Sequence, residues 1–492
     1  MRVLRSFLLA VLLLAASSVS SVCAQNAKYV FYFIGDGMGM NQVLGTEYYL
    51  GELSGKFGIE PLCFAQFPYT GLVTTYSAST NVTDSSAAGT ALSTGNKTAN
   101  NVMGMLPDKT TPVESIAAKA HRQGKRVAIC STVSIDHATP AVFYAHSPSR
   151  DDRYVIGHQL SETGYEFFAG GDFGQNTDRR NPDAKSNTDY AKENGYTIVR
   201  GMADYKANFS KSDKMILLQK ERADGKNSDL VACIDRQGDE LSLCDITTAA
   251  IDFMMKDPDK GFFVMLEGGQ IDHWAHGNDA ASTFHEVIDF DNAIKIAYDF
   301  YLKHKDETLI VVTADHETGG ISLGNGAYRL NLKVLENQKI SEDQFARHME
   351  NITKERKDTL SWDEVKSELT RYFGFFDKVR VTTAQEDKLK EAYLETFGSL
   401  SRRRRPAAAG TVAQAVPEAS KEESYQYYKA DKLSDLTVRT MCDIAQVGWG
   451  TGEHSGGYVP VFAIGAGADS FTGQIDNTEI PVRIAAAAGI SW

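Results

Sequence analysis

The run YVFYFIGDGMG, residues 29–39, joins an unbroken apolar segment to an acidic residue in a glycine-rich turn. The apolar part, Tyr29–Ile34, predicts a strand buried on both faces, as the strands of parallel sheets are. Asp36 follows at once, and the glycines beside it allow a tight turn and a close approach of the backbone to a ligand. Because open α/β sheets bind ligands beyond the carboxyl ends of their strands, Asp36 is a candidate site residue. An aspartate that only closes a turn is the alternative.

Four more short apolar runs predict further buried strands, and helical patterns lie between them. The helical segments are 113–122, which Gly124 closes, and 278–303, where apolar residues recur at steps of three and four. Strands that alternate with helices predict an α/β fold, a three-layer sandwich with a large, mainly parallel central sheet and helices on both faces. The four runs are Arg126–Ser131, Phe262–Leu266, Thr308–Thr313 and Pro460–Ile464.

Residues 330–445 differ in character and predict a variable helical insertion within the domain formed by residues 25–492. Two helices are expected to open with capping boxes, one at Ser361 and the other at Thr383, each with a glutamate three residues on. Residues 401–424 have no periodicity and include four consecutive arginines, so they predict a mobile loop rather than a binding patch.

The first 24 residues have the layout of a secretory signal peptide. Two arginines precede the ten apolar residues 7–16, and small residues lead to a cleavage site after Ala24. We therefore expect an exported protein, periplasmic or extracellular. A lipid anchor on Cys23 is the alternative, and Val22 before it is a poor fit to such a signal. No other segment approaches about 18 consecutive apolar residues, so no membrane span is predicted.

The composition and net charge of the chain indicate which kinds of molecule it can bind. The chain has 492 residues, of which 42% are hydrophobic, and this is enough for a large buried core. Its formal net charge of −13 argues against a nucleic-acid partner, because nothing global attracts the chain to a phosphate backbone. An anionic substrate would have to be held by metal ions or single arginines. Cys233 and Cys244 flank a polar turn, and the pattern leaves open whether they form a disulfide or stay separate.

Acidic and imidazole side chains recur near the ends of the predicted strands. Asp272 and His276 lie four residues apart, so one helical turn can direct both at a single ion. Nitrogen and oxygen donors without thiolates suit zinc in open, catalytic coordination, and six such residues make two three-ligand sites. Glu267 and Thr139 add hard oxygen donors, which suit magnesium. The six residues are Asp36, Asp272, His276, Asp315, His316 and His454.

A serine and an arginine complete the candidate site. Ser85 lies in TDSSAAGTAL, residues 83–92, which has the character of a loop entering a helix of small residues. The N–H groups and positive dipole end of a helix N-terminus suit an anionic or phosphorylated serine, and simple N-capping by Asp84 or Ser85 is the alternative. Arg150 carries a guanidinium that fits two phosphate oxygens, and a surface ion pair is its alternative.

Taken together, these motifs resemble those of the alkaline phosphatase family. The matching segments are GDGMG, TDSSAAGTALSTGNKT, HATPAVFYAHSPSR, EGGQIDHWAH, TADHETGG and GEHSGG, in the family's order within 28–150, 260–325 and 445–490. The resemblance implies hydrolysis of small-molecule phosphate monoesters through a phosphoserine intermediate, with residues 25–492 as the catalytic domain.

The resemblance also implies a role for each candidate residue. Ser85 would be the nucleophile, Arg150 would hold the phosphoryl oxygens, and His137 and His273 would lie beside the substrate. The cofactors would be two Zn2+ ions and one Mg2+ ion. The implied ligands are Asp272, His276 and His454 for the first zinc, Asp36, Asp315 and His316 for the second, and Asp36, Thr139 and Glu267 for magnesium.

His137 and His273 mark a departure from part of the family, because some bacterial members carry Asp and Lys there and animal members carry His at both. The identity of the third metal ion is therefore open. A related phosphodiesterase or sulfatase of the same superfamily is the alternative activity, and a non-catalytic binder of metal or phosphate is the alternative class. The sequence does not fix the natural substrate, nor whether the protein is a homodimer.

Overall fold

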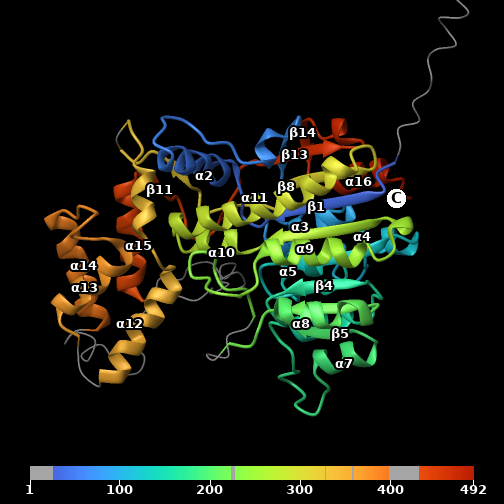
Figure 1. Ribbon diagram of the computed structural model, residues 1–492, viewed down its shortest axis with the longest axis horizontal. Coiled ribbons are helices and arrows are strands. Elements are labelled where there is room, and N and C mark those ends of the chain that lie inside the picture. The colour runs from blue at the N-terminus through green and yellow to red at the C-terminus, as the bar shows by residue number, and fades with distance from the viewer. Residues whose placement is uncertain (1–25, 223–227, 327, 357–359, 398–430) are drawn as a thin grey trace, which may run out of the picture.

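A ten-stranded sheet forms the centre of the computed structural model, which describes residues 26–222, 228–326, 328–356, 360–397 and 431–492. One strand, β13, runs antiparallel to both of its neighbours, and all other neighbouring pairs in this sheet are parallel. The mainly parallel sheet predicted from the sequence is thus confirmed (Figure 1). Its spatial order is β14 (Gly473–Asp476), β2 (Tyr69–Thr74), β13 (Val459–Gly465), β8 (Thr308–Ala314), β1 (Tyr29–Gly35), β7 (Phe262–Gly268), β3 (Arg126–Ser131), β4 (Phe167–Gly170), β6 (Met215–Leu218) and β5 (Thr197–Arg200).

The middle of the sheet aligns the carboxyl ends of three strands. Strand β1 lies between β7 and β8, and its last residue, Gly35, pairs with Gly268 of β7 and Ala314 of β8. All residues of these three strands are buried, which is why they can be continuous apolar runs. Strand β7 extends two residues beyond the predicted run, so Glu267 lies inside the strand rather than after it.

Helices cover both faces of the sheet, as predicted. Helices α9 and α11 pack together against strands β1, β3, β4, β7 and β8 on one face, and α3, α4 and α16 pack on the other. Among the described residues outside 330–445, the α-helices are α2 (Met40–Leu53), α3 (Ser85–Thr94), α4 (Ile116–Arg122), α5 (Ala138–Ala141), α6 (Arg153–Leu160), α7 (Asn187–Glu193), α8 (Gly201–Asn208), α9 (Leu243–Met254), α10 (Gln270–His276), α11 (Ala280–Lys303) and α16 (Glu479–Ala488).

Four helices gather at one end of the molecule, on the left of Figure 1: α12 (Glu342–Arg356), α13 (Trp362–Phe373), α14 (Thr383–Thr396) and α15 (Lys432–Ala445). They share a second hydrophobic cluster, which also contains Tyr49 of α2 and Phe284 of α11. The predicted capping box of α13 is present, with Ser361 as the N-cap. The box of α14 begins at Thr382 rather than the predicted Thr383, because the Thr382 hydroxyl meets the Gln385 N–H and both residues fit the capping pattern.

Some sequence predictions fall outside the described residues, namely the signal peptide 1–24, Cys23 and the loop 401–424. Within the described ranges, the thiols of Cys233 and Cys244 are free, as are the three other cysteines, so the open question of a disulfide is answered against it here. In the described part of the chain, no helix has both the length and the apolar character needed to cross a bilayer.

Candidate active site

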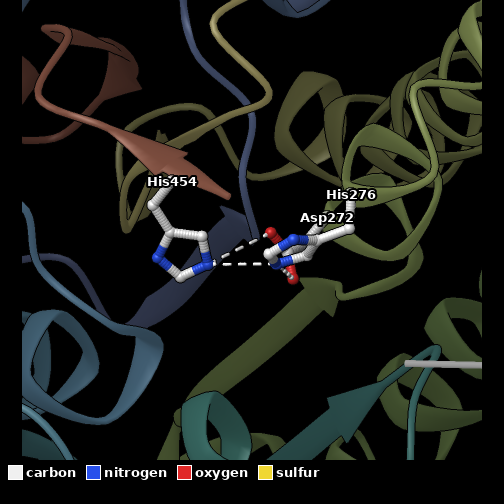
Figure 2. Close-up of side chains that lie close together, drawn as sticks. All are labelled: Asp272, His276 and His454. Atoms are coloured by element: carbon white, nitrogen blue, oxygen red, sulfur yellow. Dashed lines mark hydrogen bonds and ion pairs between the residues drawn. The ribbon is translucent and has the colours of Figure 1, made fainter. Parts of the chain in front are cut away.

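The first cluster joins two neighbouring segments of the fold. Asp272 and His276 lie on α10, directly after β7, and His454 lies on the short strand β12 (His454–Ser455). Figure 2 shows the three side chains pointing toward one another. The Nε2 atom of His276 is 3.3 Å from Asp272 Oδ2 and 3.2 Å from His454 Nε2. Two imidazole nitrogens and a carboxylate thus converge with the spacing that one metal ion requires.

The second cluster lies at the ends of β1 and β8. Asp36, Asp315 and His316 are fully buried, and His316 Nε2 is 3.3 Å from Asp36 Oδ1 and 3.4 Å from Asp315 Oδ2. The Gly37 N–H donates to Asp315 Oδ1, which fixes that carboxylate against the turn after β1. The register of the parallel strands therefore produces this cluster directly.

Ser85 faces the second cluster. It is the first residue of α3, and its Oγ atom is 3.2 Å from His316 Nε2. Asp84, rather than Ser85, caps the helix by accepting the Ala87 N–H at 2.9 Å. The Ser85 hydroxyl is therefore left to point at the site, beside the positive end of the helix dipole.

A third group of acidic and imidazole residues adjoins the second. Ligand atoms of Asp36, His137 and Glu267 lie within 4.8 Å of one another. The Thr139 hydroxyl is 3.2 Å from Asp36 Oδ2 and 3.3 Å from Asp315 Oδ2. His137, which the sequence placed beside the substrate, thus lies among the residues predicted to bind magnesium.

Arg150 is buried at the same site, and its surface ion-pair alternative is wrong. Its Nη1 is 3.2 Å from Asp84 Oδ2, and its Nη2 is 3.2 Å from His137 Nε2. Since a guanidinium only donates, His137 Nε2 accepts this hydrogen bond. The ring of His273 is 6.1 Å from that of His137, and its Nδ1 is 3.9 Å from Asp229 Oδ2. Every candidate site residue of the sequence therefore lies in one region.

The buried carboxylates of the site oppose one another electrostatically. Burial raises the pKa of Asp36 well above its ordinary value, and the charges of Asp315 and Asp272 raise it further. Burial likewise raises the pKa of Glu267 to about 8 and that of Asp315 to about 7. Burial also disfavours ionised Asp272, yet the neighbouring imidazoles, His276 foremost, hold its pKa well below the ordinary value. Such a set of acids is stabilised by added positive charge.

The donor set fits divalent metal ions. Asp36 Oδ1 and Glu267 Oε1 are buried and accept no hydrogen bond from the described residues, so each keeps lone pairs for an ion. The nitrogen and oxygen donors of the first two clusters suit zinc, and the oxygen-rich third group suits magnesium.

Some contributors were not singled out from the sequence. Glu317 and Thr318 lie in the quoted segment TADHETGG, and they form the short strand β9 (Glu317–Thr318), which pairs with the strand of His454. Ser131 donates to Glu267 Oε2, and Asp84 pairs with Arg150. The sequence suggested Asp84 only as a helix N-cap, and it gave no signal for the contacts of Ser131, Glu317 and Thr318, because most of their partners are distant along the chain.

The fold and the site together define an α/β protein with candidate metal-binding clusters beside a serine hydroxyl. Residues 27–490 match the family model of alkaline phosphatase, and the chain belongs to that family. It is 32% identical over 488 residues to alkaline phosphatase 3 of Bacillus subtilis (strain 168), across 96% of this chain and 93% of that one. Members of the family hydrolyse phosphate monoesters, so the chain is a metal-binding hydrolase of this kind.

Solved structures of alkaline phosphatases are also similar to this chain. The cold-active alkaline phosphatase of a psychrophilic Shewanella is 25% identical, with a TM-score of 0.74, across 94% of this chain and 99% of that one. A variant of the TAB5 alkaline phosphatase with a histidine replaced by glutamate is 26% identical, with a TM-score of 0.64, across 95% of this chain and all of that one. That variant has Mg bound in a site called M3.

Proposed function

We propose that this protein hydrolyses phosphate monoesters through a phosphoserine at Ser85. The observation that carries the proposal is the position of the Ser85 hydroxyl, 3.2 Å from a ligand atom of the second cluster and at a helix N-terminus. The proposed ligands of two Zn2+ ions are Asp272, His276 and His454 for the first and Asp36, Asp315 and His316 for the second. Bound zinc supplies Lewis-acid chemistry, which neutralises the substrate dianion and stabilises negative charge on the reacting oxygens.

The chain's own residues account for the covalent steps. Ser85 Oγ attacks phosphorus in line, the bond from phosphorus to the alcohol oxygen breaks, and the alcohol leaves with the serine proton. Water then attacks the phosphoserine, which releases inorganic phosphate and restores the hydroxyl. The N–H groups at the start of α3 face the phosphoryl group in both steps and favour its negative charge.

Arg150 is proposed to hold two phosphoryl oxygens. Its guanidinium is anchored by Asp84, which also caps the helix that carries Ser85. One carboxylate therefore sets the position of both the nucleophile's helix and the phosphate-binding group. Planar, bidentate donation to two oxygens is the geometry that a guanidinium provides and an ammonium does not. His137 and His273 are proposed to line the same side of the substrate.

The third group is proposed to hold one Mg2+ ion through Asp36, Thr139 and Glu267, with His137 beside them. The Mg reported for the TAB5 variant that carries glutamate in place of a histidine supports a third site in this family. A neutral imidazole suits magnesium less well than a carboxylate does. We therefore propose that His137 weakens magnesium binding in this chain.

The experiment that tests the proposed function compares two serines of one helix. Ser85→Ala should lower kcat for an aryl phosphate by at least about 10³-fold, since the nucleophile is lost. Ser93→Ala is the matched control, because Ser93 is also buried on α3 but its hydroxyl donates to the Thr90 carbonyl of the same helix. Acid quenching during turnover should yield a phosphorylated peptide that contains Ser85. Full activity of Ser85→Ala would contradict the proposal.

The alternative activities are separated by substrate. A phosphomonoesterase should hydrolyse an aryl phosphate faster than a bis-aryl phosphate or an aryl sulfate. Faster cleavage of the diester or of the sulfate would favour the phosphodiesterase or the sulfatase of the same superfamily.

We also propose that residues 1–24 are a signal peptide and that the mature protein is periplasmic or extracellular. The supporting observation is the arginine-flanked apolar run of residues 7–16. N-terminal sequencing of the exported protein should start at Gln25, whereas a lipid-modified Cys23 would contradict this. We further propose that residues 25–492 form one catalytic domain, with residues 330–445 as a variable insertion. We also propose that the protein is a homodimer, and light scattering tests this by measuring its molar mass in solution.

A further inference from the structure

A single hydroxyl lies between the two clusters proposed to bind zinc. Thr318, on β9, is fully buried. Its Oγ1 atom is 2.5 Å from Asp272 Oδ1, in the first cluster, and 3.2 Å from His316 Nδ1, in the second. The Thr318 hydroxyl contacts Asp272 through Oδ1, which also lies 3.7 Å from His454 Nε2, and it contacts His316 through Nδ1 rather than Nε2. Asp272 Oδ2 still faces His276, and His316 Nε2 still faces Asp36 and Asp315.

The chemistry of a hydroxyl fixes the direction of both hydrogen bonds. Thr318 has one proton to donate, and the contact of 2.5 Å to a carboxylate oxygen places that proton toward Asp272. The remaining lone pairs of Oγ1 can only accept, so the contact with His316 requires a proton on Nδ1. His316 is then the tautomer whose Nε2 lone pair faces Asp36, Asp315 and Ser85.

The surrounding backbone leaves space for the Thr318 hydroxyl and holds the main chain of Thr318 in place. Gly37 has φ +71°, and a Cβ on it would lie 2.8 Å from Thr318 Oγ1 and 2.9 Å from Asp272 Oδ1. The Thr318 N–H donates to Gly37 O at 3.3 Å, and the Thr318 carbonyl accepts from Gln42 Nε2 at 2.7 Å. The main chain of Thr318 is thus held on both sides, while the missing side chain of Gly37 leaves room for the hydroxyl.

We infer that Thr318 is a positioning residue shared by both zinc sites, which orients Asp272 for one and sets the tautomer of His316 for the other. The inference rests on the proposed function, since it takes the two clusters to be zinc sites. Hydrogen-bond partners of metal ligands change metal affinity by about 10- to 100-fold when they are removed. Here one hydroxyl serves two sites, so its loss weakens both sites together.

The test compares Thr318→Val with Thr318→Ser. Valine keeps the branched shape that a strand favours and removes the hydroxyl, whereas serine keeps the hydroxyl. Thr313→Val is the matched control, because the buried Thr313 hydroxyl donates to the Pro460 carbonyl and contacts neither cluster. Zinc affinity of each demetallated protein is measured by competition with a chromophoric chelator, with zinc stoichiometry read by elemental analysis.

We expect Thr318→Val to bind both zinc ions about 10- to 100-fold more weakly than wild type, and Thr318→Ser and Thr313→Val to stay within about threefold. Unchanged affinity of Thr318→Val at either site would overturn the inference. An equal loss in Thr318→Ser, or in Thr313→Val, would also overturn it, because the effect would then not come from the shared hydroxyl.

A second measurement needs no variant, so it holds even if Thr318→Val fails to fold. Nitrogen NMR of wild-type protein labelled at histidine should show His316 protonated at Nδ1, and a proton on Nε2 instead would refute the inference. None of these measurements uses substrate. A protein that binds zinc as expected but lacks phosphatase activity would refute the proposed function and leave the role of Thr318 standing.

Discussion

Glu317 forms hydrogen bonds with three chain segments that carry site residues, so its removal should lower the free energy of unfolding. Its Oε1 accepts Gln42 Nε2 at 2.8 Å and the Ile321 N–H at 3.2 Å. Its Oε2 accepts the Gly320 N–H at 3.0 Å and the Ser455 hydroxyl. Gln42 belongs to the helix after Asp36, and Ser455 follows His454. One buried carboxylate therefore anchors the neighbours of Asp36, His316 and His454.

The expected loss in the free energy of unfolding can be worked out from the hydrogen-bond donors that Glu317→Ala would leave without an acceptor. The Gly320 and Ile321 N–H groups belong to the backbone and cannot turn away. The buried Ile321 donor would cost about 1–3 kcal/mol, and the half-buried Gly320 donor would cost less. Gln42 and Ser455 can reorient in part, because Gln42 also donates to the Thr318 carbonyl. We therefore expect a loss of about 3–6 kcal/mol in the free energy of unfolding. Glu317→Gln keeps one acceptor oxygen and should lose about half of that.

The assay is urea unfolding of the demetallated proteins, so that bound metal does not mask the difference. Glu114→Ala is the control, because Glu114 is an exposed carboxylate whose ion pair is with Arg122 at 3.0 Å. It should change the free energy of unfolding by less than about 0.5 kcal/mol. A loss below about 1 kcal/mol in Glu317→Ala, or equal losses in the Ala and Gln variants, would refute the reasoning.

Three further results are expected. In demetallated protein the raised pKa values of Asp315 and Glu267, about 7 and about 8, mean that the folded chain keeps protons that the unfolded chain releases. The free energy of unfolding should therefore fall from about pH 5 to about pH 8, and zinc-loaded protein, measured by the same urea unfolding, should show a smaller fall. Arg150→Lys should raise KM for an aryl phosphate and weaken inhibition by phosphate, each by about 10-fold, with zinc content unchanged; an unaltered phosphate inhibition constant would count against a bidentate contact. His137→Asp should tighten Mg2+ binding, measured by calorimetry, since it adds a hard oxygen donor, and weaker binding would argue against the third site.

The apolar runs and the acids at their ends were enough to predict the centre of the fold. A strand buried on both faces must be continuously apolar, and the carboxyl ends of neighbouring parallel strands must meet at one edge. Asp36 and Asp315 therefore follow β1 and β8 to the same place. The first turn of a helix is equally local, which is why the N-terminus of α3 and Ser85 could be predicted from the sequence.

Other features of the site depend on contacts between residues far apart in the chain. The sequence did not distinguish a surface pair from the buried Arg150–Asp84 pair, nor did it indicate that His137 lies next to Glu267. The Thr318 hydroxyl acquires its function only because α10 and β9 approach within hydrogen-bonding distance. Local patterns determine which side chains stand at a strand end or helix start, because those depend on backbone periodicity. Which of these side chains form hydrogen bonds or ion pairs with one another depends on packing between distant segments, and only the tertiary structure decides that.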